Sequence, residues 1–222
     1  MRIAVFGGTG NVGSAVVAEA VQRGHEVTVL SRREAQVVPD GAAWRAGDAA
    51  DPDVVAETAR ENDVVVSALG PSRAPGEDPF AFEGVVRTMA GAVGSTRLII
   101  VGGAGSLFIA PNVRLFDTDG FPAEYQDESR ASYAALEFLR GAGHDLDWTY
   151  LSPAPEIGPG ERTGRYVLGE ESPAGDRISF ADYAVALLDE IEHPAHHRAR
   201  FTVADEATAA GRATSSAATE PN

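Results

Sequence analysis

Met1-Arg-Ile-Ala-Val-Phe-Gly-Gly-Thr-Gly-Asn-Val-Gly-Ser-Ala15 is the stretch of sequence that decides the fold. Its apolar run, Ile3 to Phe6, has the length of a buried strand, and the residues through Gln22 place valines and alanines on one helical face. Between strand and helix, three glycines follow at three-residue spacing: Gly7, Gly10 and Gly13. A strand, a glycine turn and a helix in this order are the dinucleotide-binding fingerprint, in which the helix start holds a pyrophosphate. The alternative is a glycine turn in another kind of α/β protein.

The composition fits one α/β domain and excludes several classes of function. The chain has 222 residues, 44% of them hydrophobic, and no cysteine, so it has neither disulfides nor thiolate metal ligands. The net charge of −15 argues against a nucleic-acid or an anionic-membrane partner. Because the chain shows neither a signal segment nor an apolar run near the roughly 20 residues of a membrane span, we expect a cytoplasmic protein. All 18 basic residues are arginine, and lysine is absent.

Strands and helices alternate along the chain. The patterns predict strands over 26–31, 42–46, 63–67, 97–101, 146–151 and 200–203, and helices over 51–60, 80–93, 123–140 and 178–191. This alternation predicts a Rossmann-type doubly wound parallel sheet in a single domain. We expect the NAD(P)-binding domain to span 1–204, with a small Gly/Pro-rich flap on the substrate side around 156–176. Residues 205–222 lack periodicity and are expected to be a disordered tail.

Two arginines follow the second predicted strand. In an NAD-binding fold, an acidic residue near this position takes the ribose hydroxyls, whereas a basic residue accommodates a 2′-phosphate. Arg32 and Arg33 therefore favour NADP(H), although two solvated surface arginines are the alternative. We expect the cofactor to contact the glycine turn and the segments after the strands, because ligands bind at the carboxyl ends. The expected cofactor-binding residues are Gly7, Thr9, Gly10, Asn11, Val12, Arg32, Arg33, Asp48, Ala68, Leu69, Gly70, Gly102, Gly103 and Pro153.

Five motifs resemble those of the atypical short-chain dehydrogenase/reductases. They are Gly7-Gly-Thr-Gly-Asn-Val-Gly13, Val101-Gly-Gly-Ala-Gly-Ser-Leu107, Trp148-Thr-Tyr-Leu-Ser-Pro153, Pro159-Gly-Glu-Arg-Thr-Gly164 and Ile178-Ser-Phe-Ala-Asp-Tyr-Ala184. Within that family, the chain is most similar to the NAD(P)H-flavin reductase group, which is related to the NmrA-like proteins and to biliverdin reductase B. The resemblance covers roughly residues 1–204. It implies NADP(H) binding and reduction of flavins, quinones or related planar acceptors.

One catalytic device of the wider superfamily is missing. Its main branch pairs a tyrosine with a lysine four residues later, and the lysine lowers the pKa of the tyrosine for proton transfer. Here Glu137 follows Tyr133 at that spacing, and the chain has no lysine. We therefore do not expect an alcohol dehydrogenase. A flavin or quinone needs only an oriented hydride donor and a dry pocket.

The candidate catalytic residues are Ser106 and Tyr133, with the N–H groups of residues 103–106 as donors to a developing anion. The structural alternatives are a turn serine and a core or interface aromatic residue. Two further clusters have simpler explanations. The three histidines within 193–197 are expected in a solvated turn, not at a metal. The acidic residues between 117 and 128 are expected on a solvated face.

Three functions remain open after the sequence has been read. The first is an NADPH-dependent oxidoreductase that transfers hydride to a flavin, quinone or similar planar acceptor. The second is a regulator of the NmrA-like kind that senses NADP(H) without turnover. The third is an NAD-dependent epimerase/dehydratase-like enzyme, for which the chain is short. We expect a small-molecule acceptor as partner, with no nucleic acid and no membrane, and a monomer or homodimer.

Overall fold

A computed structural model describes residues 1–33 and 38–207. The central sheet contains seven strands that run parallel to their neighbours and one antiparallel strand at the edge, β10. Its order is β10 (Tyr166–Gly169), β12 (Ala199–Asp205), β8 (Trp148–Pro153), β5 (Arg97–Val101), β4 (Val64–Ser67), β1 (Arg2–Phe6), β2 (Glu26–Ser31) and β3 (Ala43–Ala46).

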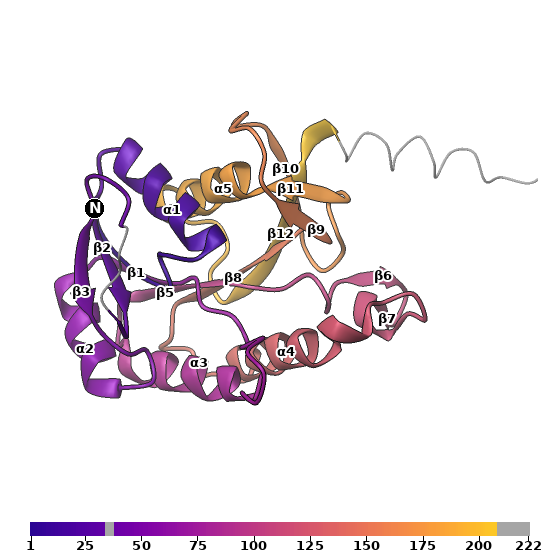
Figure 1. Cartoon of the computed structure of the whole chain (residues 1–222), viewed down its shortest axis with the longest axis horizontal. Coiled ribbons are helices and arrows are strands. Elements are labelled where there is room, and N and C mark those ends of the chain that lie inside the picture. The colour runs from indigo at the N-terminus through magenta and orange to yellow at the C-terminus, as the bar shows by residue number, and fades with distance from the viewer. Residues whose placement is uncertain (34–37, 208–222) are drawn as a thin grey trace, which may run out of the picture.

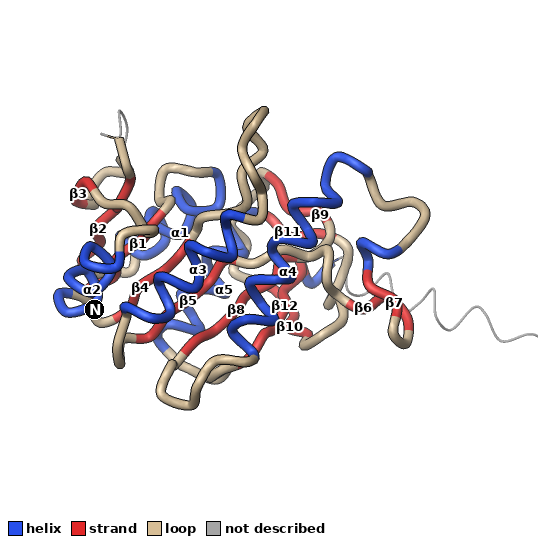
Figure 2. The backbone as a smooth tube through the Cα atoms, turned by 90° about the horizontal axis from the view of Figure 1, so that it is seen from below, coloured by secondary structure: helices blue, strands red, loops and turns tan. Residues whose placement is uncertain are grey.

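Helices cover both faces of this sheet. Figure 1 shows α1 (Asn11–Gln22) and α5 (Phe180–Glu192) on one face, with α2 (Pro52–Glu61), α3 (Ala81–Ala92) and α4 (Gln126–Arg140) on the other. In Figure 2, seen from the side of α2 to α4, these three helices cross in front of the strands. The prediction of a Rossmann-type doubly wound sheet in a single domain is confirmed.

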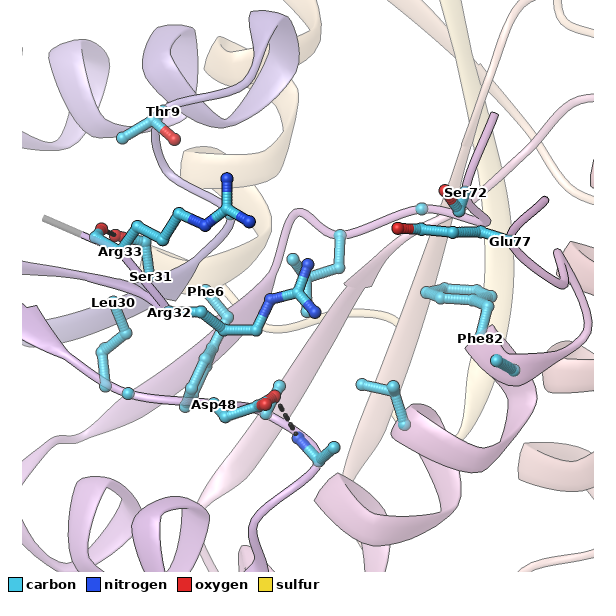
Figure 3. Close-up of a pocket in the computed structure, with 18 of the residues that line it drawn as sticks. Phe6, Thr9, Leu30, Ser31, Arg32, Arg33, Asp48, Ser72, Glu77 and Phe82 are labelled. Carbon is cyan, nitrogen blue, oxygen red and sulfur yellow. Dashed lines mark hydrogen bonds between the residues drawn. The ribbon is translucent and has the colours of Figure 1, made fainter. Parts of the chain in front are cut away.

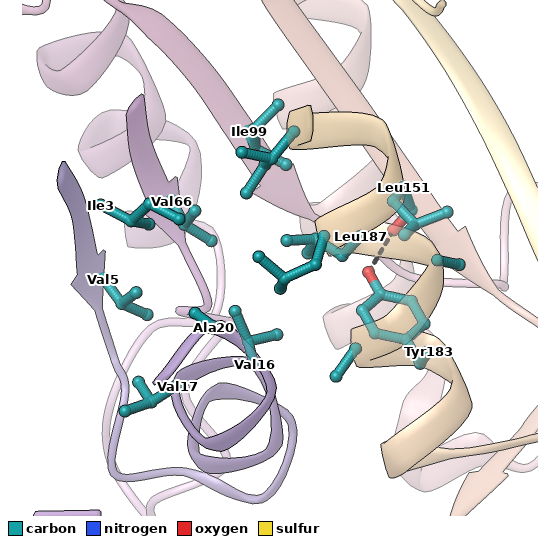
Figure 4. Close-up of a cluster of buried hydrophobic side chains, with 14 of the residues drawn as sticks. Ile3, Val5, Val16, Val17, Ala20, Val66, Ile99, Leu151, Tyr183 and Leu187 are labelled. Atoms are coloured by element: carbon teal, nitrogen blue, oxygen red, sulfur yellow. Dashed lines mark hydrogen bonds between the residues drawn. The ribbon is translucent and has the colours of Figure 1, made fainter. Parts of the chain in front are cut away.

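The side chains of each strand point alternately to the two faces of the sheet, so the core forms two layers. Ile3 and Val5 of β1 pack with α1 and α5, whereas Ala4 and Phe6 point to the side of α2 to α4. Successive side chains of a strand point to opposite faces, so a strand covered on both sides reads as a continuous apolar run. Figure 4 shows the first of these two layers, in which Val16 of α1 points toward α5 and Val17 lies on the side of β1.

Two of the quoted motifs are joined by one buried carboxylate. Asp182, which is 1% exposed in the first turn of α5, accepts hydrogen bonds from the N–H groups of Thr163 (2.9 Å) and Gly164 (2.7 Å) and from the Thr163 hydroxyl (2.7 Å). Ser179 caps the same helix through its hydroxyl, which accepts the N–H of Asp182 at 2.9 Å. These contacts fix the loop that precedes β10 against the start of α5.

The segment around 156–176 is built of two different parts. β9 (Glu156–Gly158) pairs with β11 (Arg177–Ser179) outside the main sheet, whereas β10 extends the main sheet beside β12. A second small unit, β6 (Phe108–Ala110) with β7 (Val113–Arg114), forms an antiparallel pair that leads into the short helices η1 (Leu115–Asp117) and η2 (Ala123–Tyr125).

Residues 205–207 of the predicted tail lie within the described part of the chain, and β12 continues through Asp205. The remainder of the predicted tail, 208–222, lies outside the described residues. Among the residues that are described, no helix combines the length and the apolar character that crossing a membrane requires.

Candidate functional site: two cavities at the carboxyl ends of the strands

The three glycines at three-residue spacing, Gly7, Gly10 and Gly13, have different structural roles. Gly7 has φ +78°, a left-handed conformation that favours glycine. A Cβ on Gly13 would lie 2.1 Å from the carbonyl oxygen of Gly7, so this glycine lets α1 approach the end of β1. A Cβ on Gly10 would meet only that same oxygen, at 3.5 Å, which is ordinary contact. The protein itself therefore leaves room for a side chain at Gly10.

The start of α1 is open to a ligand. Gly10 is the N-cap residue, and no side chain caps the helix. The first N–H groups of a helix have no partner within it, and together with the helix dipole they attract an anion. Asn11 and Val12, which were expected to bind the cofactor, occupy these first positions of α1.

A cleft of about 960 Å³ opens beside this turn. Its walls come from the ends of β1, β2 and β3, from the loop after β4 and from the start of α3 (Figure 3). Seven of the expected cofactor-binding residues line it: Gly7, Thr9, Arg32, Arg33, Asp48, Leu69 and Gly70. Ala68 does not line it, but the carbonyl carbon and oxygen of Ala68 lie against Gly7.

The two arginines after β2 are exposed and extend into this cleft (Figure 3). Neither Arg32 nor Arg33 forms an ion pair with another residue of the described part of the chain. Asp48 bends the chain after β3, because its carboxylate accepts the N–H of Ala50 at 3.0 Å. The cleft thus offers two guanidinium groups without an ion-pair partner among the described residues, next to an uncapped helix start.

A second cavity, of about 710 Å³, lies farther along the same edge of the sheet. It is lined by Gly102 and Gly103 after β5, by Pro153 at the end of β8, by the start of α4 and by the segment from 115 to 122. Gly102, Gly103 and Pro153 were expected to contact the cofactor. Its aromatic and apolar lining includes Leu115, Phe121, Pro122, Tyr125 and Ile157.

The glycines after β5 let the chain lie flat against its neighbours. A Cβ would lie 2.0 Å from the ring of Tyr150 if placed on Gly102, and 2.5 Å from the Ser129 hydroxyl if placed on Gly105. On Gly103 it would lie 3.4 Å from the hydroxyl oxygen of Ser132. The distinctive Val-Gly-Gly-Ala-Gly-Ser-Leu stretch is therefore explained by close packing on β8 and α4.

Tyr150 fixes this loop from beneath the cavity. Its hydroxyl accepts the N–H of Gly103 at 3.2 Å and donates to the carbonyl of Ser132 at 3.1 Å. Burial raises the pKa of Tyr150 to about 12, although the Gly103 N–H acts in the opposite direction. Ser152 donates to the Gly103 carbonyl at 2.9 Å. Because Tyr150 already holds the Gly103 N–H, this group is not a free donor for a developing anion.

Ser106 and Tyr133 come together, but they line neither cavity. Arg114 donates to the Tyr133 hydroxyl and to the Ser106 carbonyl, both at 2.7 Å. The Ser106 hydroxyl, in a residue only 3% exposed, accepts from the buried Arg200 at 2.8 Å. Glu137 pairs with Arg140 instead of Tyr133. The catalytic role of Ser106 and Tyr133 stays a prediction that these contacts do not favour.

The sequence-based prediction missed residues of α4 that lie on a different face of this helix from Tyr133. Ser129 and Ser132 of α4 line the second cavity, together with Tyr125 just before that helix. Residues three apart on a helix share a face, so the Ser129–Ser132 spacing is a signal that was present in the sequence. No hydrogen bond from the Ser132 side chain to a described residue is formed, which leaves this hydroxyl available beside Gly103.

The loop after β4 contributes lining residues to both cavities. Residues 70 and 72 line the first cleft, and Arg73 lines the second. The guanidinium of Arg73 forms a bidentate ion pair with Glu128 of α4, with N–O distances of 2.6 and 2.7 Å. It also lies 5.3 Å from the centre of the Tyr125 ring. This pair ties the loop after β4 to the start of α4.

The histidine cluster has carboxylate partners. His196 bonds to Glu190 at 2.7 Å, and His197 bonds to Asp147 at 2.8 Å. Within residues 1–33 and 38–207, no group of three His, Asp or Glu side chains is arranged to hold a metal ion.

A family model described as NAD(P)H-binding matches residues 7–194, and the chain belongs to this family. The fold and the glycine turn thus define an NAD(P)H-binding Rossmann-type protein.

Particular relatives extend this result. The chain is 39% identical over 217 residues to YwnB, an uncharacterized protein of Bacillus subtilis strain 168, covering 93% of this chain and all of YwnB. It is 37% identical to the solved structure of a candidate epimerase from Bacteroides thetaiotaomicron, with a TM-score of 0.81 and coverage of 92% and 96%. A candidate NADH-flavin reductase from Streptococcus pneumoniae TIGR4 is 33% identical, with a TM-score of 0.82 and coverage of 93% and 100%.

Proposed function

We propose that this protein is an NADPH-dependent oxidoreductase that delivers a hydride to a flavin, a quinone or a similar planar acceptor. The observation that carries the proposal is the pair of adjacent cavities at the carboxyl ends of one parallel sheet. One is suited to a phosphorylated dinucleotide, and the other to a flat, largely apolar molecule. The 33% identity to the streptococcal candidate NADH-flavin reductase supports the same reaction class.

The first cleft fits a dinucleotide on physical grounds. The uncapped start of α1, with Gly10, Asn11 and Val12, would hold the pyrophosphate through backbone N–H groups. Arg32 and Arg33 would hold a 2′-phosphate through charge-assisted hydrogen bonds. The remaining expected contacts, Thr9, Asp48, Ala68, Leu69 and Gly70, would orient the ribose and adenine. Gly102, Gly103 and Pro153 would position the nicotinamide end, which supplies the hydride when the cofactor is bound.

The second cavity would orient the acceptor and exclude water. The rings of Phe121 and Tyr125 offer flat apolar surface, and the hydroxyls of Ser129 and Ser132 offer hydrogen bonds at the floor. Orientation within a dry pocket is the contribution that such a transfer requires of the protein. Neither cavity contains a tyrosine–lysine pair, which agrees with an acceptor that can take its proton from water.

Steady-state oxidation of NADPH tests the proposed activity. We expect turnover with riboflavin and with a short-chain quinone, and none with simple secondary alcohols. The control is the same assay with heat-inactivated protein, because quinones and flavins react slowly with NADPH by themselves. Tight NADPH binding without turnover across a broad acceptor panel would instead support the NADP(H)-sensing regulator.

Cofactor choice is tested at the end of β2. We expect NADPH to bind more tightly than NADH, and the double change Arg32→Ala with Arg33→Ala to weaken NADPH binding by about 1.5–3 kcal/mol more than NADH binding. Calorimetric titration of both cofactors measures the difference. Arg60→Ala, on the exposed side of α2, is the matched control and should leave both affinities unchanged. Equal losses for the two cofactors would mean that the arginines do not contact the 2′-phosphate.

An epimerase/dehydratase-like activity is the second candidate, because the Bacteroides relative is described as a candidate epimerase. That chemistry needs an acid–base pair on the substrate. In this protein Tyr133 contacts Arg114 outside the cavities. The site therefore fits a reductase, whose acceptor takes up the hydride and leaves in its reduced form, better than it fits an epimerase.

A further inference from the structure

The second cavity differs from the first in the state of its positive charge. Its lining residues include one arginine, Arg73, and two carboxylates, Glu128 and Glu156. Both N–H edges of Arg73 that face Glu128 are used, at 2.6 and 2.7 Å. By contrast, Arg32 and Arg33 in the first cleft form no ion pair within the described part of the chain. Among the described residues, the first cleft therefore has arginines free to bind the cofactor, whereas the arginine of the second cavity is already paired with a carboxylate.

We propose that the second cavity selects uncharged planar acceptors over phosphorylated ones, and that Glu128 determines this preference by holding Arg73. This inference rests on the proposed function and names the acceptor class: riboflavin and uncharged quinones, with FMN disfavoured. Riboflavin and FMN carry the same ring system and differ by one phosphate group. They therefore isolate the effect of charge from the effect of shape.

The physical reason is the charge that the phosphate would meet. A phosphate monoester carries close to two negative charges at pH 7. In the second cavity Glu128 is already paired with Arg73, so the lining, with one arginine against two glutamates, keeps one uncompensated carboxylate, Glu156. The phosphate must either tolerate this repulsion or displace Glu128 from Arg73.

The preference should be moderate and should depend on salt. Arg73 is 68% exposed and Glu128 24% exposed, so their pair lies at the cavity rim in contact with water. Ions screen charges at such a position. We expect kcat/KM for riboflavin to exceed that for FMN by about fivefold to twentyfold at low salt. The ratio should shrink toward one near 1 M NaCl, where the Debye length is about 3 Å.

Three variants identify the source of the preference. Glu128→Gln keeps the shape of the side chain and frees Arg73, and it should raise the FMN-to-riboflavin ratio of kcat/KM at least fivefold. Arg73→Gln should lower this ratio below that of the wild type. The double variant restores the wild-type net charge of the lining, so its ratio should return to the wild-type value. A merely structural role of the ion pair would not produce this return. Glu83→Gln, which breaks an exposed pair with Arg87 on α3, is the matched control and should change neither flavin.

Binding measured without turnover separates this inference from the proposed function. Quenching of flavin fluorescence by the complex of the full-length protein with NADP⁺ gives the affinity for each flavin. Tighter binding of riboflavin than of FMN, with no NADPH oxidation, would support the selectivity and overturn the reductase. Oxidation of NADPH with FMN at a kcat/KM equal to or above that of riboflavin would overturn the selectivity and leave the reductase intact. Failure of both flavins to bind would overturn the selectivity, and turnover with a short-chain quinone would then leave the reductase intact.

Discussion

Gly10 is the glycine of the first turn at which a side chain meets almost none of the protein. Its neighbours in the motif are different, because Gly7 needs a left-handed backbone and Gly13 lies against the Gly7 carbonyl. Two of the glycines are thus required by the fold itself. The third is free of that requirement, so a ligand that approaches the backbone is the reason we propose for it.

We expect Gly10→Val to remove NADPH binding and to leave a folded protein, because its side chain would occupy the space of the pyrophosphate. Calorimetry measures the binding, and circular dichroism with a melting curve checks the fold. Gly91→Val, at an equally open position of α3, is the control for the substitution itself. Gly13→Val should fail to fold. Unchanged NADPH affinity in a folded Gly10→Val protein would refute the placement of the pyrophosphate.

At this scale the sequence predicted the positions that follow from strand ends and missed those that follow from helix rotation. Arg32, Arg33 and Asp48 come directly after strands, and the structure places them along one cleft. Ser132 and Tyr133 are adjacent in the sequence but point about 100° apart on α4, and only Ser132 lines a cavity. Arg73 could not be foreseen, because its partner is 55 residues away on another element.

The element that shapes the second cavity is the β5–α4 connection. Its glycines lie against β8 and α4, and the far end of the connection is held by Arg114 and Arg200. Arg114 stacks on the rings of Phe108 and Tyr133 at 4.2 Å and bonds to Tyr133 and Ser106. This cluster supports the loop, and these contacts favour a structural role for Tyr133, whose catalytic role stays a prediction.

We therefore expect Tyr133→Phe to keep NADPH oxidation within about tenfold of the wild type, since the loss of one positioning hydrogen bond is worth about 1.4 kcal/mol. It should lower the free energy of unfolding by about 1 kcal/mol through the loss of the Arg114 contact. Ser106→Ala should also stay active but should destabilise more, by about 2 kcal/mol, because it leaves the fully buried Arg200 without that acceptor.

Steady-state rates and urea denaturation test both variants. A thousandfold loss of activity in a stable Tyr133→Phe protein would show that the tyrosine is a general acid after all.

For the whole molecule, the alternation of apolar strands and amphipathic helices was sufficient to predict the doubly wound sheet. β10 was not predicted as part of that sheet, because its four residues sit in a Gly/Pro-rich segment, and three half-buried positions with one exposed position give no clear alternation. Its place beside β12 depends on tertiary contacts, including the hydrogen bond from the Tyr166 hydroxyl to Asp189 of α5 at 2.5 Å. Such contacts connect distant segments and leave no local pattern.

The two helices on one face are joined by a partly buried charge network that centres on one buried carboxylate. Glu19 of α1, 4% exposed, accepts hydrogen bonds from Arg23 and from Arg162 at 2.6 to 2.8 Å. Arg23 in turn binds Asp189 and Glu192 of α5 at 2.6 and 2.7 Å. The hydrogen bonds from Arg162 hold the pKa of Glu19 below its ordinary value, against the effect of burial.

We expect Glu19→Gln to lower the free energy of unfolding by about 2 kcal/mol at pH 7. A carboxylate whose pKa is depressed in the folded state contributes stability above its ordinary pKa, here 4.5, and that stability is lost as the pH falls through the folded value. The difference between wild type and variant should therefore shrink below pH 4.5. Melting temperatures from pH 7 to pH 3 measure it. Glu57→Gln, at an exposed position of α2, is the control.

The packing of α1 against α5 also affects the order in which the chain folds during synthesis. The glycine turn and α1 leave the ribosome long before α5, yet the helix that covers the apolar side of α1 ends at Glu192. Contacts between such distant segments slow folding and leave apolar surface open in the unfinished chain, where chaperones bind. The glycine turn and α1 therefore reach their final environment only after α5 has been made, and a nascent chain released before α5 would lack the packing that supports the first cleft.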